Sequence, residues 1–398
     1  MKVGIILVGT ELLNGDIVDT NSQFIQNYLL EYGMDCTLKV VVKDHIESII
    51  AAIEFVENKV DLLIMSGGLG PTFDDITRDA ISKFYGAALE IDAKSYEKMK
   101  GYFDSRATAM PENNMRQVTL PKGCEVVENQ VGVAPGFYIG KILALQGVPR
   151  ELEDGLKRFI STKYSKSNPK FKKDILLYGV AESVVEDSMI DIIKRYEREL
   201  EFEILARPYG IILRTIYSQR QESIAHGVVE KIKSRVQEWY YGEDSDRLES
   251  KLVKILREKG LKISLAESCT GGLIAAALTS VSGVSEVFQE GLVTYSNDSK
   301  QSRLGVSEGT LEKFGAVSEE CIKEMLRGLK TPIKIAVSGI AGPMGGSVDK
   351  PVGLVIIGVE VEGKQVIIKH HFGGEREMIQ ERAKNCAMFQ LLKWIAKN

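Results

Sequence analysis

A hydroxyl, a thiol and two glycines stand together in residues 266–272, which read AESCTGG. An apolar, strand-like stretch precedes them at residues 261–265, and an alanine-rich stretch that predicts a helix follows at residues 273–278. Where a strand turns into a helix, backbone amides converge and the helix dipole favours a phosphate or a developing oxyanion. The segment therefore indicates either a catalytic or anion-binding turn or, more simply, a helix start capped by serine or threonine.

Three residues of this turn, Ser268, Cys269 and Thr270, are candidate nucleophiles, and each needs a base to remove its proton. The chain has only four histidines, and none lies in the glycine- and hydroxyl-rich loops of the last third. Lys300 is then the base that fits best, because a partly desolvated lysine can lose its charge and accept a hydroxyl proton. Tyr295 could orient the pair or relay a proton. The simpler alternatives are a solvated Lys300 at a helix start and a Cys269 that fills a small apolar space.

The first third of the chain alternates apolar strands with amphipathic helices, which predicts a doubly wound α/β domain. Ligands in such folds bind beyond the carboxyl ends of the strands, where the loops after residues 3–8 and 60–65 fall. The second of these loops, residues 66–72 (SGGLGPT), offers glycine amides that can cradle a phosphate.

Aspartates follow both loops. Asp16, Asp74 and Asp75 are hard oxygen ligands suited to magnesium or a similar cation. The alternative is that each caps a helix or favours its positive end. The two loops together predict a phosphate-bearing ligand.

Length and composition indicate the number of domains and the class of protein. A chain of 398 residues is long for one core and predicts two or three domains, and 44% hydrophobic with 27% charged residues is typical of a soluble globular protein. No apolar run reaches the roughly 18 residues that cross a bilayer. Five scattered cysteines without a C-x-x-C pair favour a reducing cytoplasm. The net charge of −4 gives no general attraction to nucleic acid.

The middle of the chain reads as a small α+β unit. Residues 159–174 turn polar and lysine-rich, as at a domain junction, and residues 242–246 form an acidic connector. The strand-helix-strand-strand-helix pattern between them resembles a KH-like arrangement but lacks the G-x-x-G clamp for RNA, which favours a spacer or dimerisation role. We therefore expect three domains, at residues 1–168, 169–244 and 245–398.

Motifs in the first third identify a resemblance. Residues 9–13 (GTELL), 19–21 (DTN), 66–72 and 147–149 (GVP) resemble the molybdopterin-binding-like domain of the CinA family. The resemblance implies metal-dependent hydrolysis of ADP-ribose to AMP and ribose 5-phosphate, although the wider fold family binds or adenylylates molybdopterin. The residues expected to contact that ligand are Gly9, Thr10, Glu11, Asp19, Asn21, Ser66, Gly67, Gly68, Leu69, Gly70, Pro71 and Thr72.

The last third is similar to the CinA C-terminal domain, through residues 266–272, 294–297 with Lys300, 315–318, and 338–343 with 350–353. The resemblance implies deamidation of nicotinamide mononucleotide to nicotinate mononucleotide and ammonia, without a cofactor. Ser268 takes the role of nucleophile and Lys300 that of base, with Tyr295 assisting. The implied substrate contacts are Thr270, Gly271, Gly272, Ser338, Gly339, Ala341, Gly342, Arg382 and, as the weaker of the two arginine candidates, Arg376.

Taken together, the sequence predicts a cytoplasmic, bifunctional hydrolase of pyridine nucleotides: a deamidase joined to an ADP-ribose pyrophosphatase that uses a divalent metal ion. Two alternatives stay open. One is a deamidase whose first domain only binds a nucleotide or molybdopterin, and the other is a competence- or damage-associated binding protein. The resemblance suggests a homodimer, and neither a membrane nor nucleic acid is expected as a partner.

Overall fold

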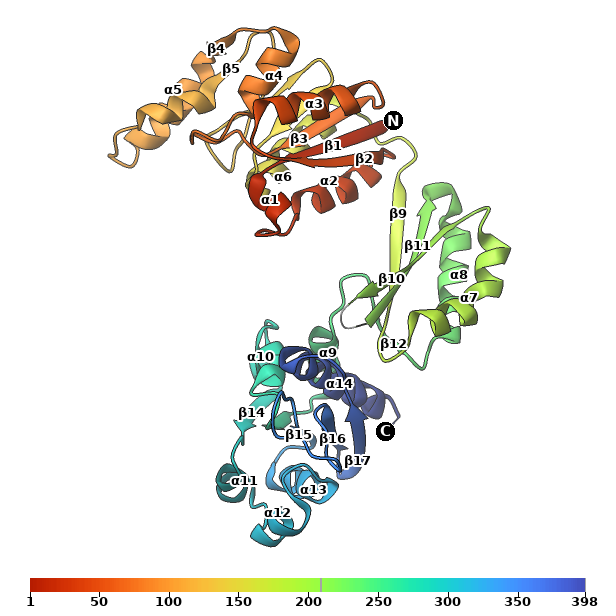
Figure 1. Cartoon of the computed structure of the whole chain (residues 1–398). Coiled ribbons are helices and arrows are strands. Elements are labelled where there is room, and N and C mark those ends of the chain that lie inside the picture. The colour runs from red at the N-terminus through yellow and green to blue at the C-terminus, as the bar shows by residue number, and fades with distance from the viewer. Residues whose placement is uncertain (208–209, 398) are drawn as a thin grey trace. The chain divides into compact units, whose positions relative to one another are not determined.

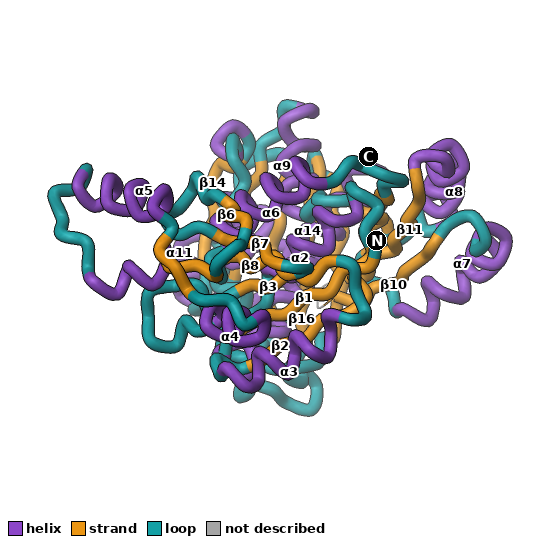
Figure 2. The backbone as a smooth tube through the Cα atoms, turned by 90° about the horizontal axis from the view of Figure 1, so that it is seen from above, coloured by secondary structure: helices purple, strands orange, loops and turns teal. Residues whose placement is uncertain are grey.

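The computed structural model describes residues 1–207 and 210–397, so the expected end of the last domain at residue 398 lies outside the described residues. The chain forms two compact units (Figure 1). The first comprises Met1–Phe171 with Ser218–Arg220, and the second comprises Lys172–Tyr217 with Gln221–Asn398. The alternation of helices and strands along the chain can be followed in Figure 2.

The first unit is built on a six-stranded sheet of order β2-β1-β3-β8-β7-β6. The first four of these strands are parallel, and the last two join antiparallel. The strands are β1 (Lys2–Val8), β2 (Asp35–Val42), β3 (Leu62–Ser66), β6 (Glu125–Val127), β7 (Gly136–Ile139) and β8 (Ile142–Leu145).

Helices cover both faces of this sheet, so it is a doubly wound α/β layer. One core joins α2 (Asn21–Leu30) and α6 (Pro149–Lys163) to one face, and a second core joins α3 (Ile46–Glu57) and α4 (Thr77–Tyr85) to the other. Because both faces are covered, β3 is buried at every residue. The remaining elements are α1 (Thr10–Asn14), β4 (Leu89–Ile91), α5 (Ala93–Asp104), the 3₁₀ helix η1 (Glu112–Val118) and β5 (Thr119–Pro121).

The middle segment has a four-stranded sheet of order β10-β11-β9-β12 with two helices packed on it. Its elements are β9 (Lys170–Leu177), α7 (Glu182–Tyr196), β10 (Glu201–Arg207), β11 (Gly210–Ser218), the 3₁₀ helix η2 (Gln219–Gln221), α8 (Glu222–Arg235) and β12 (Tyr240–Glu243). The expected acidic connector at residues 242–246 therefore begins inside a strand. β12 pairs antiparallel with β9, and this long-range pairing outweighs the weak strand signal of an acidic, glycine-containing sequence.

The last segment has a five-stranded sheet of order β14-β13-β15-β16-β17, in which β14, β13 and β15 are parallel. Its strands are β13 (Ile263–Glu267), β14 (Phe288–Val293), β15 (Ile333–Gly339), β16 (Leu354–Val361) and β17 (Lys364–His371). Its helices are α9 (Leu248–Lys259), α10 (Leu273–Thr279), the 3₁₀ helix η3 (Val284–Glu286), α11 (Asn297–Leu304), α12 (Glu308–Phe314), α13 (Glu319–Gly328) and α14 (Arg376–Lys397).

Two cores again sandwich the sheet. The larger joins α9, α10 and α14 to one face, and the smaller joins α11, α12 and α13 to the other. The carboxyl ends of the parallel strands thus open at one edge, which is where a doubly wound sheet binds ligands. Among the described residues, no helix combines the length and the apolar character that crossing a membrane requires.

Candidate functional site

Ser268 lies directly beyond the carboxyl end of β13. The parallel ladder continues past the strand ends, because the Ser268 amide donates to the Val337 carbonyl (3.0 Å) and the Thr294 amide donates to the Glu267 carbonyl (2.8 Å). Ser268 and Thr294 are therefore held side by side by backbone bonds that do not depend on their side chains. Ser268 is 7% exposed, so its hydroxyl lies in a largely dry environment.

Lys300 reaches the Ser268 hydroxyl from α11. The Ser296 hydroxyl caps this helix by accepting from the Ser299 amide, which fixes where the helix begins. Lys300 is 1% exposed, and its Nζ lies 3.0 Å from Ser268 Oγ. The same Nζ donates to the carbonyl oxygens of Thr294 (2.8 Å) and Tyr295 (3.2 Å).

The surroundings of Lys300 favour a neutral amine. Burial lowers the pKa of Lys300, and its three hydrogen-bond partners include no carboxylate that would hold the charge. Two of the partners are carbonyls, which only accept. A neutral amine can therefore satisfy both carbonyls with its two N–H groups and turn its lone pair to Ser268 Oγ. That is the arrangement a base for this hydroxyl needs.

Cys269 is the less suitable nucleophile. Its side chain is buried, and burial raises the pKa of the thiol to about 12, so the thiolate is disfavoured. Its carbonyl accepts a hydrogen bond from the side-chain amide of Gln380 in α14 (2.7 Å). Gln380 was not predicted as a site residue, because nothing in the helical pattern of α14 shows which residue meets the turn.

Glu267 occupies the start of α10. Its carboxylate, 1% exposed, accepts from the amides of Gly272 (3.1 Å), Ile274 (3.1 Å) and Ala275 (2.8 Å). These three helix-start amides are therefore not free for a substrate oxyanion, since an internal anion already uses them. The sequence predicts the amides near the start of this helix or those of the Ser338–Gly339 loop as the oxyanion donors.

Thr270 keeps its donors free. Gly271 uses its own amide to bond the Ser268 carbonyl (3.0 Å). Within the part of the chain that the structure describes, the amide of Thr270 has no hydrogen-bond partner, and neither has its buried hydroxyl. Thr270 thus retains unused donors close to Ser268.

Arg376 joins the loop after β15 to Tyr295. Its guanidinium donates to the Gly342 carbonyl (2.7 Å) and to the Tyr295 hydroxyl (2.9 Å). The Tyr295 side chain is 59% exposed, so it is the backbone carbonyl of Tyr295, rather than its hydroxyl, that contacts Lys300. In the same loop the Ser338 hydroxyl is committed to the Ala316 carbonyl (2.7 Å), while Ala341 is buried. Gly339 is the last residue of β15 and pairs with β16.

Arg382 lies on the other side of α14. Arg376 and Gln380 are four residues apart and share a helix face, whereas Arg382 is two residues from Gln380, about 200° around the helix. Its guanidinium donates to the Gly373 carbonyl, and its backbone carbonyl accepts from the Tyr178 hydroxyl (3.2 Å). The structure therefore brings Arg376, and not the favoured Arg382, to the predicted site.

A second candidate site lies in the first unit. A cavity of about 500 Å³ opens at the carboxyl ends of β1, β3 and β8. The predicted residues that line it are Glu11, Asp19, Asn21, Ser66, Gly67, Gly68, Leu69, Gly70, Pro71, Thr72, Asp74 and Asp75.

Three predicted residues do not line this cavity. Gly9 bonds the Val42 carbonyl through its amide (3.0 Å), and Asp16 bonds the Glu11 carbonyl (2.9 Å). The amide and the hydroxyl of Thr10 both donate to one oxygen of Asp44, each at 2.8 Å. Asp44, which does line the cavity, was not predicted, because it lies in a loop after β2 without any motif.

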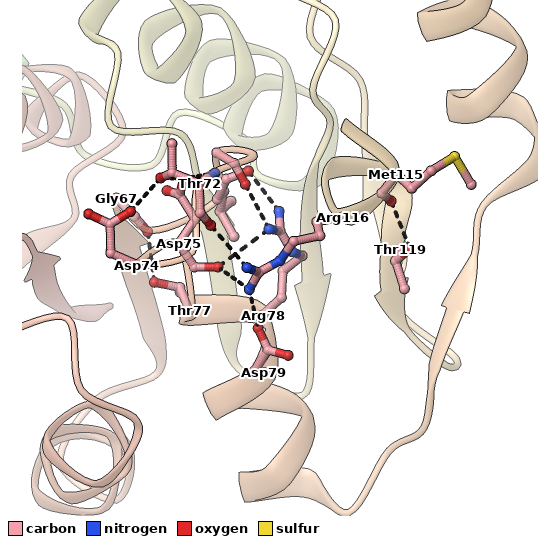
Figure 3. A network of polar contacts seen from close by, with 12 residues as sticks. Gly67, Thr72, Asp74, Asp75, Thr77, Arg78, Asp79, Met115, Arg116 and Thr119 are labelled. Carbon is pink, nitrogen blue, oxygen red and sulfur yellow. Dashed lines mark hydrogen bonds and ion pairs between the residues drawn. The ribbon is translucent and has the colours of Figure 1, made fainter. Parts of the chain in front are cut away.

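The glycine loop after β3 turns its carbonyls toward α4. The Gly67 carbonyl accepts from the Thr77 hydroxyl (2.8 Å) (Figure 3). The Gly68 carbonyl accepts from the Thr77 amide (3.1 Å). Gly67 has a φ of 104°, and a Cβ there would lie 2.1 Å from the Val8 carbonyl oxygen, so only glycine fits.

Arginines hold the rest of this loop. Arg78 donates to the carbonyls of Leu69 (2.7 Å) and Gly70 (2.8 Å), and Arg116 donates to the carbonyl of Thr72 (3.0 Å) (Figure 3). No pattern in the sequence indicates these contacts, since Arg78 reads as an ordinary residue of an amphipathic helix and Arg116 as part of a connecting segment.

The aspartates do not form a metal cluster. The carboxylates of Asp74 and Asp75 both lie within hydrogen-bond distance of the Thr72 hydroxyl, whose single proton they share, and Asp75 also accepts from the Thr72 amide (2.8 Å). Asp16 is not among the residues that line their cavity. Over residues 1–207 and 210–397, no group of three or more His, Cys, Asp or Glu side chains is placed to hold a metal ion.

Comparisons with known proteins match the first and the last part of the chain to two different families of domains. Residues 245–395 match the family model described as the CinA C-terminal domain, and residues 4–166 match that described as "Probable molybdopterin binding domain". A CinA-like protein of Fusobacterium nucleatum is 42% identical over an alignment that covers 100% of this chain and 99% of that protein. A CinA-like protein of Kosmotoga olearia is 39% identical, with 98% and 97% covered.

The crystal structure of the competence/damage inducible protein CihA from Agrobacterium tumefaciens is 40% identical over 37% of this chain and 92% of that chain, with a TM-score of 0.36. The matches to the proteins of Fusobacterium nucleatum and Kosmotoga olearia, at 42% and 39% identity over nearly the whole chain, establish the family. The chain, with its molybdopterin-binding-like first domain and its CinA C-terminal domain, belongs to the CinA family.

Proposed function

We propose that the C-terminal domain deamidates nicotinamide mononucleotide, with Ser268 as nucleophile and Lys300 as base. The observation that carries this proposal is the 3.0 Å contact between Lys300 Nζ and Ser268 Oγ, made by an amine that is 1% exposed. A solvated lysine would be charged at neutral pH and could not accept a proton, whereas this buried one has a lowered pKa.

The chemistry follows from that contact. Lys300 takes the Ser268 proton while Oγ attacks the carboxamide carbon, so the C–O bond forms and the carbonyl oxygen becomes an oxyanion. The tetrahedral intermediate collapses, the C–N bond breaks, and the nitrogen leaves as ammonia with the proton that Lys300 returns. Water, deprotonated by Lys300, then attacks the acyl-enzyme and releases the nicotinate product and free Ser268.

Two neighbouring residues suit the charges of this reaction. Because Glu267 already fills the start of α10, the free amide of Thr270 is the donor that we assign to the oxyanion. Arg376, which reaches both Tyr295 and the Gly342 loop, is the cation assigned to the substrate phosphate.

For the N-terminal domain we propose the binding and hydrolysis of ADP-ribose. In a trans peptide the C=O and N–H groups point in opposite directions. The carbonyls of Gly67, Gly68 and Leu69 face α4, so the amides of Gly68, Leu69 and Gly70 face away from it, on the side of the cavity. Within the described residues these three amides have no hydrogen-bond partner, and such a row of donors suits a phosphate.

Two of the three predicted aspartates are the residues that would hold a divalent metal ion in this cleft. Asp74 and Asp75 converge on one hydroxyl, so their carboxylates are close enough to share an ion. With Asp16 elsewhere, two carboxylates suit Mg²⁺, which is commonly held by one or two carboxylates together with water and substrate phosphates. The ion would neutralise phosphate charge, and the glycine-loop amides would hold and orient the phosphates.

One observation favours a second candidate for this domain. Asp74 and Asp75 are already hydrogen-bonded to Thr72, and no protein cage for a metal exists among the described residues. A cleft of this kind suits a domain that binds a nucleotide without hydrolysing it.

The test uses the full chain and measures ammonia release from nicotinamide mononucleotide. Ser268→Ala and Lys300→Met should each lower kcat by about a thousandfold or more, because the nucleophile and its base act as one unit. Ser302→Ala, an exposed serine of α11, should keep the wild-type rate. Full activity in either site variant would contradict the assignment.

AMP release from ADP-ribose in the same preparations separates the two candidates for the first domain. The proposal expects AMP release that requires a divalent ion and falls at least tenfold, roughly, in Asp74→Asn. Asp104→Asn, an exposed aspartate of α5, is the matched control. Binding of ADP-ribose without AMP release in the wild type would instead select the non-catalytic candidate.

A further inference from the structure

The guanidinium of Arg78 donates to two carbonyls of the glycine loop, whose amides at Gly68, Leu69 and Gly70 have no partner among the described residues. We infer that Arg78 is the positioning residue of this anion site: it orients the Gly70 amide toward the cleft and supplies a fixed positive charge beside the loop. The inference rests on the proposed function, in which this cleft binds the phosphates of a nucleotide. It adds the residue that makes the loop receptive to phosphate.

The hydrogen bonds show how Arg78 acts on the loop. Its Nη1 donates to the Leu69 carbonyl at 2.7 Å, and its Nη2 donates to the Gly70 carbonyl at 2.8 Å (Figure 3). Fixing the Leu69 carbonyl also fixes the orientation of the Gly70 amide in the same peptide unit. The residue after Gly70 is Pro71, which has no amide hydrogen, so the Leu69 contact is the one that sets a donor.

The charge of Arg78 is buried without a paired carboxylate. Its side chain is 2% exposed, and among the described residues it takes part in no ion pair within 4.0 Å. Burial lowers the pKa of Arg78 to about 10, which still leaves it charged at neutral pH. Its hydrogen-bond partners are all carbonyls, and attraction to the carboxylates of Asp79 and Asp75 offsets the cost of burial only in part, since the pKa stays lowered. An anion in the cleft would recover part of that cost.

A lysine could not do the same. The planar guanidinium reaches two successive carbonyls with two parallel N–H groups, whereas an ammonium is a single point on a flexible stem. Arg78→Lys keeps the charge and loses the fork, and Arg78→Met loses both. The two variants therefore separate the orienting role from the electrostatic one.

The experiment measures binding of inorganic pyrophosphate to the full chain by calorimetry, together with KM and kcat for ADP-ribose. Arg78→Met should weaken pyrophosphate binding and raise KM by about ten- to a hundredfold, with kcat within about twofold of wild type, since the contact acts on bound phosphate in ground and transition states alike. Arg78→Lys should recover part of the loss. Arg106→Met, an exposed arginine in the turn after α5 that stacks on Tyr102, should behave as wild type.

Ammonia release from nicotinamide mononucleotide serves as the internal control, and it should be unchanged in all three variants. If Arg78→Met does not fold, Arg78→Lys decides alone, and wild-type affinity for pyrophosphate in that variant overturns the inference. Wild-type affinity and KM in Arg78→Met overturn it as well.

The outcomes for the two proposals differ. Wild-type protein that binds pyrophosphate in an Arg78-dependent way but releases no AMP would end the pyrophosphatase proposal and leave the role of Arg78 in place. AMP release that is unchanged in the Arg78 variants would support the pyrophosphatase proposal and end the proposed role of Arg78. Wild-type protein that binds neither pyrophosphate nor ADP-ribose would contradict both.

Discussion

At the scale of single residues, the titratable neighbour of the candidate nucleophile is unusual. Ser268 contacts an amine and not an imidazole, and that amine donates to two backbone carbonyls. The pKa of this base is lowered mainly by burial, against the smaller, opposing contributions of Cys321 and Cys269.

That environment predicts a pH dependence. The kcat/KM for deamidation should rise with pH through the pKa of Lys300 in the folded protein, which burial places below that of an ordinary lysine, because only the neutral amine accepts the Ser268 proton. Steady-state rates across the alkaline range test this. A kcat/KM that falls over the same range would contradict a lysine base.

The lowered pKa of Lys300 also makes the free energy of unfolding depend on pH. Between the lowered folded pKa and the unfolded pKa of roughly 10.4, the unfolded chain binds more protons than the folded one, so Lys300 makes the free energy of unfolding rise with pH in that window. Urea titrations of the wild type and of Lys300→Met should show that this rise is lost in the variant.

The sequence predicted the Ser268–Lys300 pair although the residues are 32 positions apart. It could do so because each follows one of two strands expected in the same sheet, and carboxyl ends of parallel strands share an edge. The roles of Glu267, Gln380 and Arg78 could not be predicted in this way. Each depends on the direction of one side chain across a helix–loop contact, and no spacing or residue type records that direction.

At the scale of elements, the short helix α10 depends on Glu267. A helix of seven residues is marginal by itself, and the carboxylate satisfies three of the amides at its start. The turn that carries Ser268 is thereby fixed between a strand and a capped helix.

This cap predicts a loss of stability on substitution. Glu267→Gln keeps the shape but has one acceptor oxygen and no charge, so the free energy of unfolding should fall by about 1–3 kcal/mol. Urea unfolding measures it, with Glu312→Gln, an exposed position of α12, as the control. Equal stability of the two variants would show that the cap contributes little.

The elements themselves were predicted unevenly. Continuously apolar strands such as β1 and β3 could be predicted because burial on both faces leaves a plain pattern. The strand β12 could not be predicted, because its sequence is half polar and its pairing partner β9 lies about 70 residues earlier. Just beyond β12, the Asp244 amide donates to the carbonyl of Asp174 in β9.

At the scale of the whole molecule, the two units have separate hydrophobic cores. Because the cavity proposed to bind phosphate is lined entirely by residues of the first unit, a ligand there should stabilise that unit alone. The homodimer and the cytoplasmic location stay predictions, and light scattering of the full chain addresses the first of them.

Calorimetry of the full chain tests the independence of the units. We expect two unfolding transitions, and pyrophosphate should raise the midpoint temperature of only one of them. Ammonia release should be lost when the protein is heated through the other transition. A single transition that pyrophosphate shifts as a whole would show that the units unfold together.

The burial of Lys300 has one more consequence. An amine with a lowered pKa is intrinsically easier to acylate than an ordinary lysine, since more of it is in the nucleophilic, neutral form at a given pH. With 1% of its surface exposed, however, Lys300 is shielded from electrophiles in solution. The same shielding that creates the reactive amine therefore protects it from activated acyl compounds in the surrounding solution, while the exposed lysines of the chain remain open to them.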